Sequence, residues 1–133
     1  MSLTVAVINY NTRDHLRRCL SSLPRRLRGE PLPTLVVDNA SPDGSARMVA
    51  TEFGTRVKLV ANSSNVGFAR AVNQALEQTT TPYVMILNAD TEHTDGAIEA
   101  LLEYMEQNPR VGVAGARLED PDGVLQHSCR AFY

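Results

Sequence analysis

The sequence predicts an α/β domain built on a mainly parallel sheet with helices on both faces. Short apolar runs alternate with longer amphipathic segments along the chain. The runs are rich in valine, isoleucine and leucine, which is typical of strands buried on both faces. Hydrophobic residues make up 43% and charged residues 21% of the 133 residues, so a packed core is expected. A chain of this length suits a single domain, residues 1–133.

An apolar run and its flanking residues define the first strand and the first helix. LTVAVIN, residues 3–9, predicts a buried strand. Asn11 or Thr12 can cap a helix that ends near Leu23, because Pro24 cannot continue it.

Turn-forming residues divide the middle of the chain. Residues 28–33 are expected to form a loop, and TLVVD (34–38) the second strand. NASPDGSA then leads into a helix at about 44–53, for which Asp43 is a candidate cap. The third strand is expected at 57–61.

The second half of the chain continues the alternation of strands and helices. The remaining expected elements are a polar loop at 62–67, a helix at 68–79, a strand at 81–88, a helix from Thr94 or Asp95 to about Asn108, a strand at 111–116 and a hairpin at 119–125. This order predicts parallel strands with helical crossovers. Because the chain stops at SCRAFY without closing the last edge, we expect it to be the N-terminal part of a longer protein.

Charge and cysteine content exclude several classes of function. The net charge of −2 gives no general attraction to nucleic acid. Arginines cluster between residues 13 and 28, which would suit association of the full-length protein with a membrane surface. Cys19 and Cys129 are far apart and form no CxxC, which argues against a zinc site and favours reduced thiols. With no signal peptide and no apolar stretch of membrane-spanning length, a cytoplasmic location is expected.

Motifs of several common sites are missing. The chain has no G-x-G-x-x-G, no G-x-x-x-x-G-K-[ST] and no G-x-S-x-G, so neither a dinucleotide fold, a P-loop nor a serine hydrolase is supported. His15, His93 and His127 are not spaced as metal ligands.

Polar residues follow each of the first four predicted strands. In open parallel sheets, ligands bind outside the carboxyl ends of the strands. Each loop alone can be explained as a turn, but together they favour a polar ligand site. The four ends are Asn9-Tyr10-Asn11, Asp38-Asn39-Ala40-Ser41, Asn62-Ser63-Ser64-Asn65 followed by Gly67, and Asn88-Ala89-Asp90-Thr91.

The chemistry available at this edge is that of carboxylates and amides. Asp38 can accept a hydrogen bond from a base N–H, and Asn39 offers both a donor and an acceptor. Asp90 is a hard oxygen ligand suited to Mg²⁺ or Mn²⁺ when phosphate oxygens supply most of the other ligands. Such a metal would offset the charge of a diphosphate leaving group.

Five segments follow one another along the chain: VAVINYNTRDHLRRCLSSL, LVVDNASPDGSARMV, NSSNVGFARAVNQAL, YVMILNADTEHTDGAIEALLEYM and VGVAGARLEDPDGVLQHSCR. Together they resemble the inverting glycosyltransferases of family two, and especially the rhamnosyltransferase-like enzymes. The resemblance implies the GT-A fold, a nucleotide-diphosphosugar donor such as a UDP- or dTDP-sugar, and Mg²⁺ or Mn²⁺. It also implies a hydroxyl acceptor on a saccharide or lipid-linked saccharide.

The resemblance also implies roles for individual residues. Asp38 would bind the nucleobase, and Asp90 would bind the metal in a D-x-D motif whose first position here is Asn88, which would contact ribose or phosphate. The expected substrate-binding residues are Asn9, Tyr10, Asn11, Asp38, Asn39, Asn65, Gly67, Asn73, Asn88, Ala89 and Asp90.

The family's catalytic carboxylate lies in the half that follows, and nothing in this chain matches it. Asp120 and Asp122 are interpreted as turn residues, so no catalytic residue is assigned and the chain alone is expected to be inactive. Two alternatives stay open: a non-catalytic α/β module for protein association, and a nucleotidyltransferase, which would want a glycine-rich loop after the first strand. If that half is missing, an apolar surface should be left open, and Val124, Leu125, Phe132 and Tyr133 are candidates to cover it. Because such patches often drive self-association, a homodimer is expected.

Overall fold

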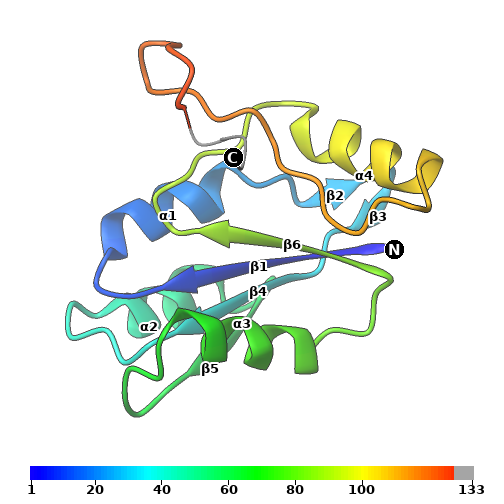
Figure 1. Cartoon of the computed structure of the whole chain (residues 1–133). Coiled ribbons are helices and arrows are strands. Elements are labelled where there is room, and N and C mark those ends of the chain that lie inside the picture. Colours follow the sequence, from blue (N-terminus) through cyan, green and yellow to red (C-terminus); the bar gives the residue numbers. More distant parts are fainter. Residues whose placement is uncertain (128–133) are drawn as a thin grey trace, which may run out of the picture. The chain divides into compact units, whose positions relative to one another are not determined.

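A four-stranded parallel sheet is the centre of the first of two units into which the chain divides (Figure 1). The computed structural model describes residues 1–127; the first unit is Met1–Asp95, and the second begins at Gly96. All neighbouring strands of the sheet are parallel, which confirms the mainly parallel α/β architecture. In spatial order the strands are β5 (Val57–Ala61), β4 (Thr34–Asp38), β1 (Leu3–Asn9) and β6 (Tyr83–Asn88).

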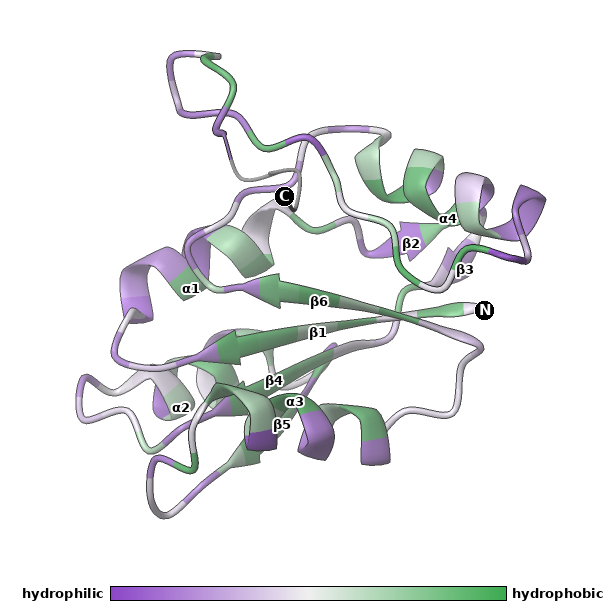
Figure 2. Cartoon of the chain, viewed as in Figure 1, coloured by the Kyte–Doolittle hydropathy of each residue, from purple (hydrophilic) through white to green (hydrophobic). Residues whose placement is uncertain are grey.

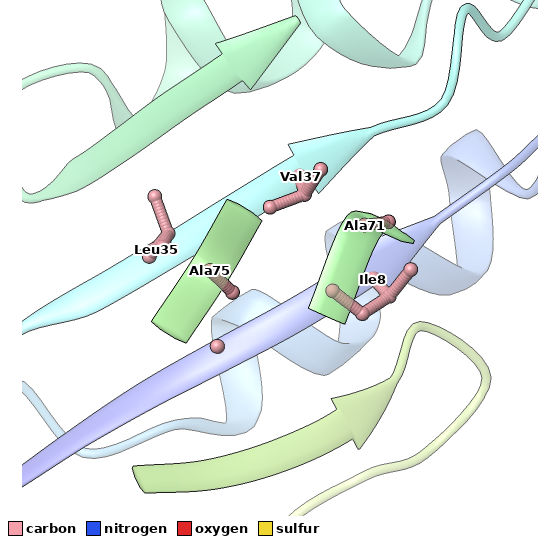
Figure 3. Close-up of a cluster of buried hydrophobic side chains, with 6 residues drawn as sticks. Ile8, Leu35, Val37, Ala71 and Ala75 are labelled. Carbon is pink, nitrogen blue, oxygen red and sulfur yellow. The ribbon is translucent and has the colours of Figure 1, made fainter. Parts of the chain in front are cut away.

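Helices cover both faces of this sheet. α3 (Phe68–Glu77) connects β5 to β6 and packs on β1 and β4. α1 (Arg13–Ser22) and α2 (Ser45–Met48) contact one another and lie on the opposite face (Figures 1 and 3). The helix predicted at 44–53 begins as α2 and continues as a π-helical stretch, η1 (Val49–Phe53).

Strand alternation divides the core between the two faces. Val5, Val7 and Val36 point to one face, where α1 buries Leu16 and Leu20, and all five side chains are fully buried. On the other face, small residues allow α3 to approach the sheet closely (Figure 3). That second cluster consists of Ala6, Ile8, Leu35, Val37, Ala71 and Ala75.

A short hairpin occupies part of the segment that the sequence predicts as a loop. β2 (Arg26–Leu27) pairs antiparallel with β3 (Glu30–Pro31). The turn residues Arg28 and Gly29 have φ values of 50° and 84°, and positive φ at both central residues is the signature of a type I′ turn. The glycine was a visible signal, but arginine at the other position is unusual and concealed the hairpin.

The second unit contains α4 (Ala97–Gln107), which buries Ile98 and Leu102. The predicted strand at 111–116 is wrong: these residues have no regular structure. Two glycines raise the entropic cost of a strand there, and Val113, 89% exposed, gains nothing from burial.

The predicted hairpin at 119–125 is confirmed as a tight turn closed by an antiparallel bridge between Glu119 and Leu125. The amide of Asp120 donates to the carbonyl of Val124 at 2.8 Å. Within residues 1–127, none of the helices is both long and apolar enough to cross a membrane.

Candidate functional site

The carboxyl ends of the four strands meet at one edge of the sheet. Asn9 pairs in register with Asp38, and Asp38 pairs with Ala61. Asn88 lies opposite Ile8, on the other side of β1. The apolar strands β1 and β6 give way to polar loops at this edge (Figure 2). The structure therefore brings the predicted polar strand ends of the first unit to one side of the sheet.

Asp38 is the centre of a buried network at this edge. Its side chain is 1% exposed, and Oδ1 accepts hydrogen bonds from Asn9 Nδ2 (2.8 Å) and Ser41 Oγ (2.6 Å). Oδ2 accepts one from the Ser41 amide at 3.0 Å. A carboxylate offers about four acceptor positions, so Oδ1 is saturated and Oδ2 has one position left.

The same network shapes the loop after β1. Thr12 Oγ1 donates to Asn9 Oδ1 at 2.8 Å, so both ends of the Asn9 side chain are used internally. The Asn11 amide donates to Ser41 Oγ at 2.8 Å. Asn11 and Ala40 have φ values of 54° and 61°, in the left-handed region. Strain of this kind is common at functional sites, where neighbouring contacts must hold it in place.

Asp43 hydrogen-bonds to the first residues of both α1 and α2. Its carboxylate accepts from the Arg13 amide at 2.7 Å, and from the amide and hydroxyl of Ser45 at 3.0 and 2.6 Å. Burial acts to raise the pKa of Asp43, but these hydrogen bonds outweigh it and the pKa is lowered. The N-cap residue of α2 is Gly44 and not the predicted Asp43, which lies one residue earlier and links the first residues of the two helices.

Asn39 points to the other face and is also engaged internally. It is 3% exposed; its Oδ1 accepts from Asn62 Nδ2 at 3.0 Å, and its Nδ2 donates to the carbonyl of Gly67 at 3.3 Å. Asn62 in turn pairs with Gln74 of α3. Asn62, Gln74, Ser41 and Thr12 were not among the assigned site residues, because nothing in the linear sequence shows which loops meet.

Gly67 is the N-cap residue of α3 and has φ 85° and ψ 163°, a conformation that is essentially restricted to glycine. A Cβ added there would meet no atom within 4 Å, so the cost of a side chain is conformational and not steric. We expect Gly67→Ala to lower the free energy of unfolding by about 1–3 kcal/mol in urea denaturation. Gly112→Ala, in open space without a positive φ, is the control; an equal effect of both variants would contradict this.

Asn88, Ala89 and Asp90 stand at the end of β6. Ala89 is buried, whereas Asn88 and Asp90 are exposed on either side of it. Thr91 closes the turn by donating from its amide (3.3 Å) and its hydroxyl (2.8 Å) to the carbonyl of Asn88. The turn therefore presents an amide and a carboxylate to solvent at the edge of the sheet.

A metal ion here would depend on Asp90. Residues 1–127 contain no group of three or more histidine, cysteine, aspartate or glutamate side chains arranged to hold one. A single exposed carboxylate fits Mg²⁺ or Mn²⁺ only when phosphate oxygens and water complete the coordination shell. The donor set is thus suited to a metal that arrives with a phosphorylated ligand.

The other predicted residues are exposed around this edge. Tyr10 is 51% exposed, and Asn65, also exposed, accepts from the Gly67 amide through its Oδ1 at 2.9 Å. Asn73 lies on the exposed side of α3, and the amide network reaches Gln74 instead. Phe68, 55% exposed, is a further aromatic side chain beside Gly67 that the assignment did not include.

Cys19 is buried behind the same edge. Its Sγ lies 4.0 Å from the Asn88 carbonyl and from Thr91 Oγ1. Burial raises the pKa of this thiol from its ordinary 9.0 to about 11, with smaller contributions from nearby Asp90 and Glu92. Cys129 lies outside the described residues.

We expect Cys19 to resist iodoacetamide at pH 8 in folded protein carrying Cys129→Ser, because the thiolate is the reactive form. Mass spectrometry should show modification only after denaturation. Because the folded pKa exceeds the unfolded value, the stabilising effect is complete below pH 9 and is lost as the pH rises through 11. Equal labelling rates for folded and unfolded protein would contradict the burial.

The arginines of α1 are largely paired with acids. This leaves less free positive charge than the sequence suggests, although the predicted membrane-surface association stays a prediction. The pairs are Arg13–Asp14 (3.2 Å), Arg17–Asp14 (2.9 Å), Arg17–Glu52 (2.9 Å) and Arg18–Glu92 (3.5 Å).

A pocket of about 340 Å³ lies elsewhere, between the end of α1 and the start of β5. Leu23, Phe53 and Arg56 contribute to its wall. Arg56 stacks over Phe53 and donates to the Leu20 carbonyl at 2.5 Å. The pocket thus adjoins the edge where the strands begin, and it is separate from the polar strand ends.

Comparison with known proteins identifies a family. The model described as "Glycosyl transferase family 2" matches residues 4–127. An N-acetylglucosaminyl-diphospho-decaprenol L-rhamnosyltransferase of Mycobacterium tuberculosis is 30% identical over 139 residues, which cover 96% of this chain and 45% of that protein. A teichoic acid poly(glycerol phosphate) polymerase of Staphylococcus epidermidis is 32% identical over 81% of this chain and 17% of its own length. The chain thus spans less than half the length of these relatives.

Solved structures share the fold. TarS of S. aureus, residues 1–349, has a TM-score of 0.69 at 20% identity, covering 82% of this chain and 33% of its own. The mannosyltransferase PcManGT of Pyrobaculum calidifontis, solved with GDP-Man and Mn²⁺, has a TM-score of 0.68 at 26% identity, covering 78% and 32%. These similarities confirm the expected GT-A architecture.

Proposed function

This chain belongs to glycosyl transferase family 2, and from that membership we propose that it forms the part of a glycosyltransferase that binds a nucleotide-diphosphosugar donor. TarS has been solved with UDP-GlcNAc and PcManGT with GDP-Man, which supports this class of ligand. A UDP- or dTDP-sugar is the donor that we expect.

The observation that carries the proposal is the arrangement of the strand ends in the first unit. Two buried networks, around Asp38 and around Asn39, fix the loops, while Tyr10, Asn88 and Asp90 are left exposed. Polar groups held in place on a rigid sheet edge are what recognition of a nucleotide requires. Asp38 Oδ2, which keeps one free acceptor position, is proposed to accept from a base N–H.

Asp90 is proposed to bind Mg²⁺ or Mn²⁺ together with the diphosphate, and Asn88 to donate to ribose or phosphate. When bound, the metal would supply Lewis-acid stabilisation of the diphosphate leaving group. The exposed position of both side chains supports these roles, because they are free to meet a ligand. Among the other predicted contacts, Asn11, Asn65 and Asn73 are exposed as well, whereas Asn9, Asn39 and Ala89 are buried.

Transfer itself is proposed to proceed with inversion, to a hydroxyl of a saccharide or lipid-linked saccharide. The M. tuberculosis relative is named for a lipid-linked acceptor, N-acetylglucosaminyl-diphospho-decaprenol, which supports this class. Inversion needs a general base that deprotonates the acceptor hydroxyl. We place that base outside these 133 residues, so the chain is proposed to bind donor without completing transfer.

Thermal unfolding with nucleotides tests the proposal. We expect UDP, dTDP or GDP at millimolar concentration with Mn²⁺ to raise the Tm of the chain, because a ligand that binds only the folded state stabilises it. AMP with Mn²⁺ and each nucleotide with EDTA are the controls. The donor-binding function would be wrong if none of the three diphosphates shifted the Tm beyond these controls.

A further inference from the structure

A chain of three side-chain amides connects the end of β4 to α3. Gln74 Nε2 donates to Asn62 Oδ1 at 2.9 Å, and Asn62 Nδ2 donates back to Gln74 Oε1 at 2.8 Å. Asn62 Nδ2 also donates to Asn39 Oδ1 at 3.0 Å. The reciprocal pair fixes both amide planes, since reversing either one would place donor against donor and acceptor against acceptor.

The Asn39 end of this chain holds the 62–67 loop. Its Oδ1 accepts from the Val66 amide at 3.4 Å, and its Nδ2 donates to the Gly67 carbonyl at 3.3 Å. One orientation of the Asn39 amide therefore satisfies all three partners, and Asn62 enforces that orientation. The loop carries Asn65 and ends at Gly67, whose φ of 85° and ψ of 163° are essentially restricted to glycine.

We propose that Gln74 is a positioning residue: through Asn62 and Asn39 it holds the 62–67 loop in the shape that a nucleotide ligand meets. This rests on the proposed donor-binding function. Gln74 itself is half-buried on α3 and needs no contact with the ligand. Its effect passes along the amide network, because the loss of Gln74 leaves Asn62 Oδ1 without its donor and removes what fixes the orientation of Asn62 toward Asn39.

The chain offers a matched control at the other end of the same two elements. Lys58, near the start of β5, donates from Nζ to Oε1 of Gln78, the C-cap residue just after α3, at 2.5 Å. Gln78→Leu thus removes one glutamine and one link between the β5 strand and α3 without touching the loop. Gln74→Leu removes the amide pair that orients Asn62.

Amide hydrogen exchange without ligand is the first measurement. In Gln74→Leu we expect exchange at Asn62, Val66 and Gly67 to accelerate by about tenfold or more, whereas Gln78→Leu leaves them unchanged. Gln74→Glu, which keeps the length but loses the donor, should accelerate the same amides and serves if the leucine variant does not fold. Exchange at wild-type rates in the Gln74 variants would overturn the proposal.

The second measurement is the Kd of the best nucleotide diphosphate with Mn²⁺, taken well below each variant's Tm. We expect at least about a fivefold weaker Kd for Gln74→Leu and an unchanged Kd for Gln78→Leu. A faster-exchanging loop with an unchanged Kd would overturn the positioning role. If wild-type protein bound no nucleotide, the donor-binding function would fall, while the exchange rates would still decide whether Gln74 anchors the loop.

Discussion

Asp38→Asn is expected to lower the free energy of unfolding by about 2–4 kcal/mol, because it disrupts the buried network at the carboxyl edge of the sheet. The substitution keeps the shape of the side chain but replaces one acceptor oxygen with a donor. In one orientation the new NH₂ group faces Asn9 Nδ2 and the Ser41 hydroxyl, and in the other orientation it faces the Ser41 backbone amide. Because Asp38 is only 1% exposed in the chain without ligand, little water reaches the new amide to replace the lost hydrogen bonds.

Urea denaturation followed by circular dichroism measures this loss. Asp95→Asn is the control, because Asp95 is exposed, and it should change the free energy by less than about 0.5 kcal/mol. Equal stability of the two variants would mean that the Asp38 carboxylate is not the centre of the buried network.

Asp90→Asn is expected to behave in the opposite way, with unchanged stability and lost metal-dependent binding. The side chain is exposed, so its replacement should leave the Tm within about 1 °C of wild type. The Mn²⁺-dependent part of nucleotide affinity should fall by more than about tenfold, or 1.4 kcal/mol, because an amide is a much poorer ligand than a carboxylate. Isothermal titration with and without Mn²⁺ separates the two contributions.

Glu92→Gln is the matched control for Asp90, since it removes one negative charge two residues away. Glu92 Oε1 lies 3.5 Å from Arg18 Nε, and Glu92 is also exposed to solvent. A general electrostatic effect would weaken binding in both variants, whereas a metal ligand acts only at position 90. Similar losses in the two variants would contradict the assignment of Asp90.

The strands of the sheet were predictable because burial on both faces demands continuous apolar residues, as in LTVAVIN and TLVVD. The strand expected at 111–116 failed for the converse reason: VGVAGA is apolar, but its glycines make it a poor strand and Val113 is exposed. The hairpin at Arg26–Pro31 was missed because Arg28 takes a positive φ that arginine rarely adopts. Prediction from apolar runs alone therefore includes some strands that do not form and misses hairpins that depend on turn geometry.

The sequence predicts where the site lies on the sheet better than it predicts which side chains hydrogen-bond to one another there. The rule for parallel sheets places Asn9, Asp38 and Asn88 at one edge, and the register confirms it. The sequence does not show that Asp38 and Asn39, adjacent in the chain, point to opposite faces and join different networks. Their direct partners Ser41 and Asn62 depend on how the loops meet at the sheet edge, which no local pattern encodes.

The proposed metal–nucleotide site at the carboxyl edge of the sheet is tested most directly by the paramagnetism of Mn²⁺ in NMR spectra of the chain. Mn²⁺ at substoichiometric concentration with a nucleotide diphosphate should broaden the amide signals of residues 9–11, 38–41 and 88–92 together. The broadening should vanish with Asp90→Asn or without the nucleotide. Broadening at 88–92 that spares residues 38–41, or that persists in the Asp90 variant, would contradict a single metal–nucleotide site at the carboxyl edge of the sheet.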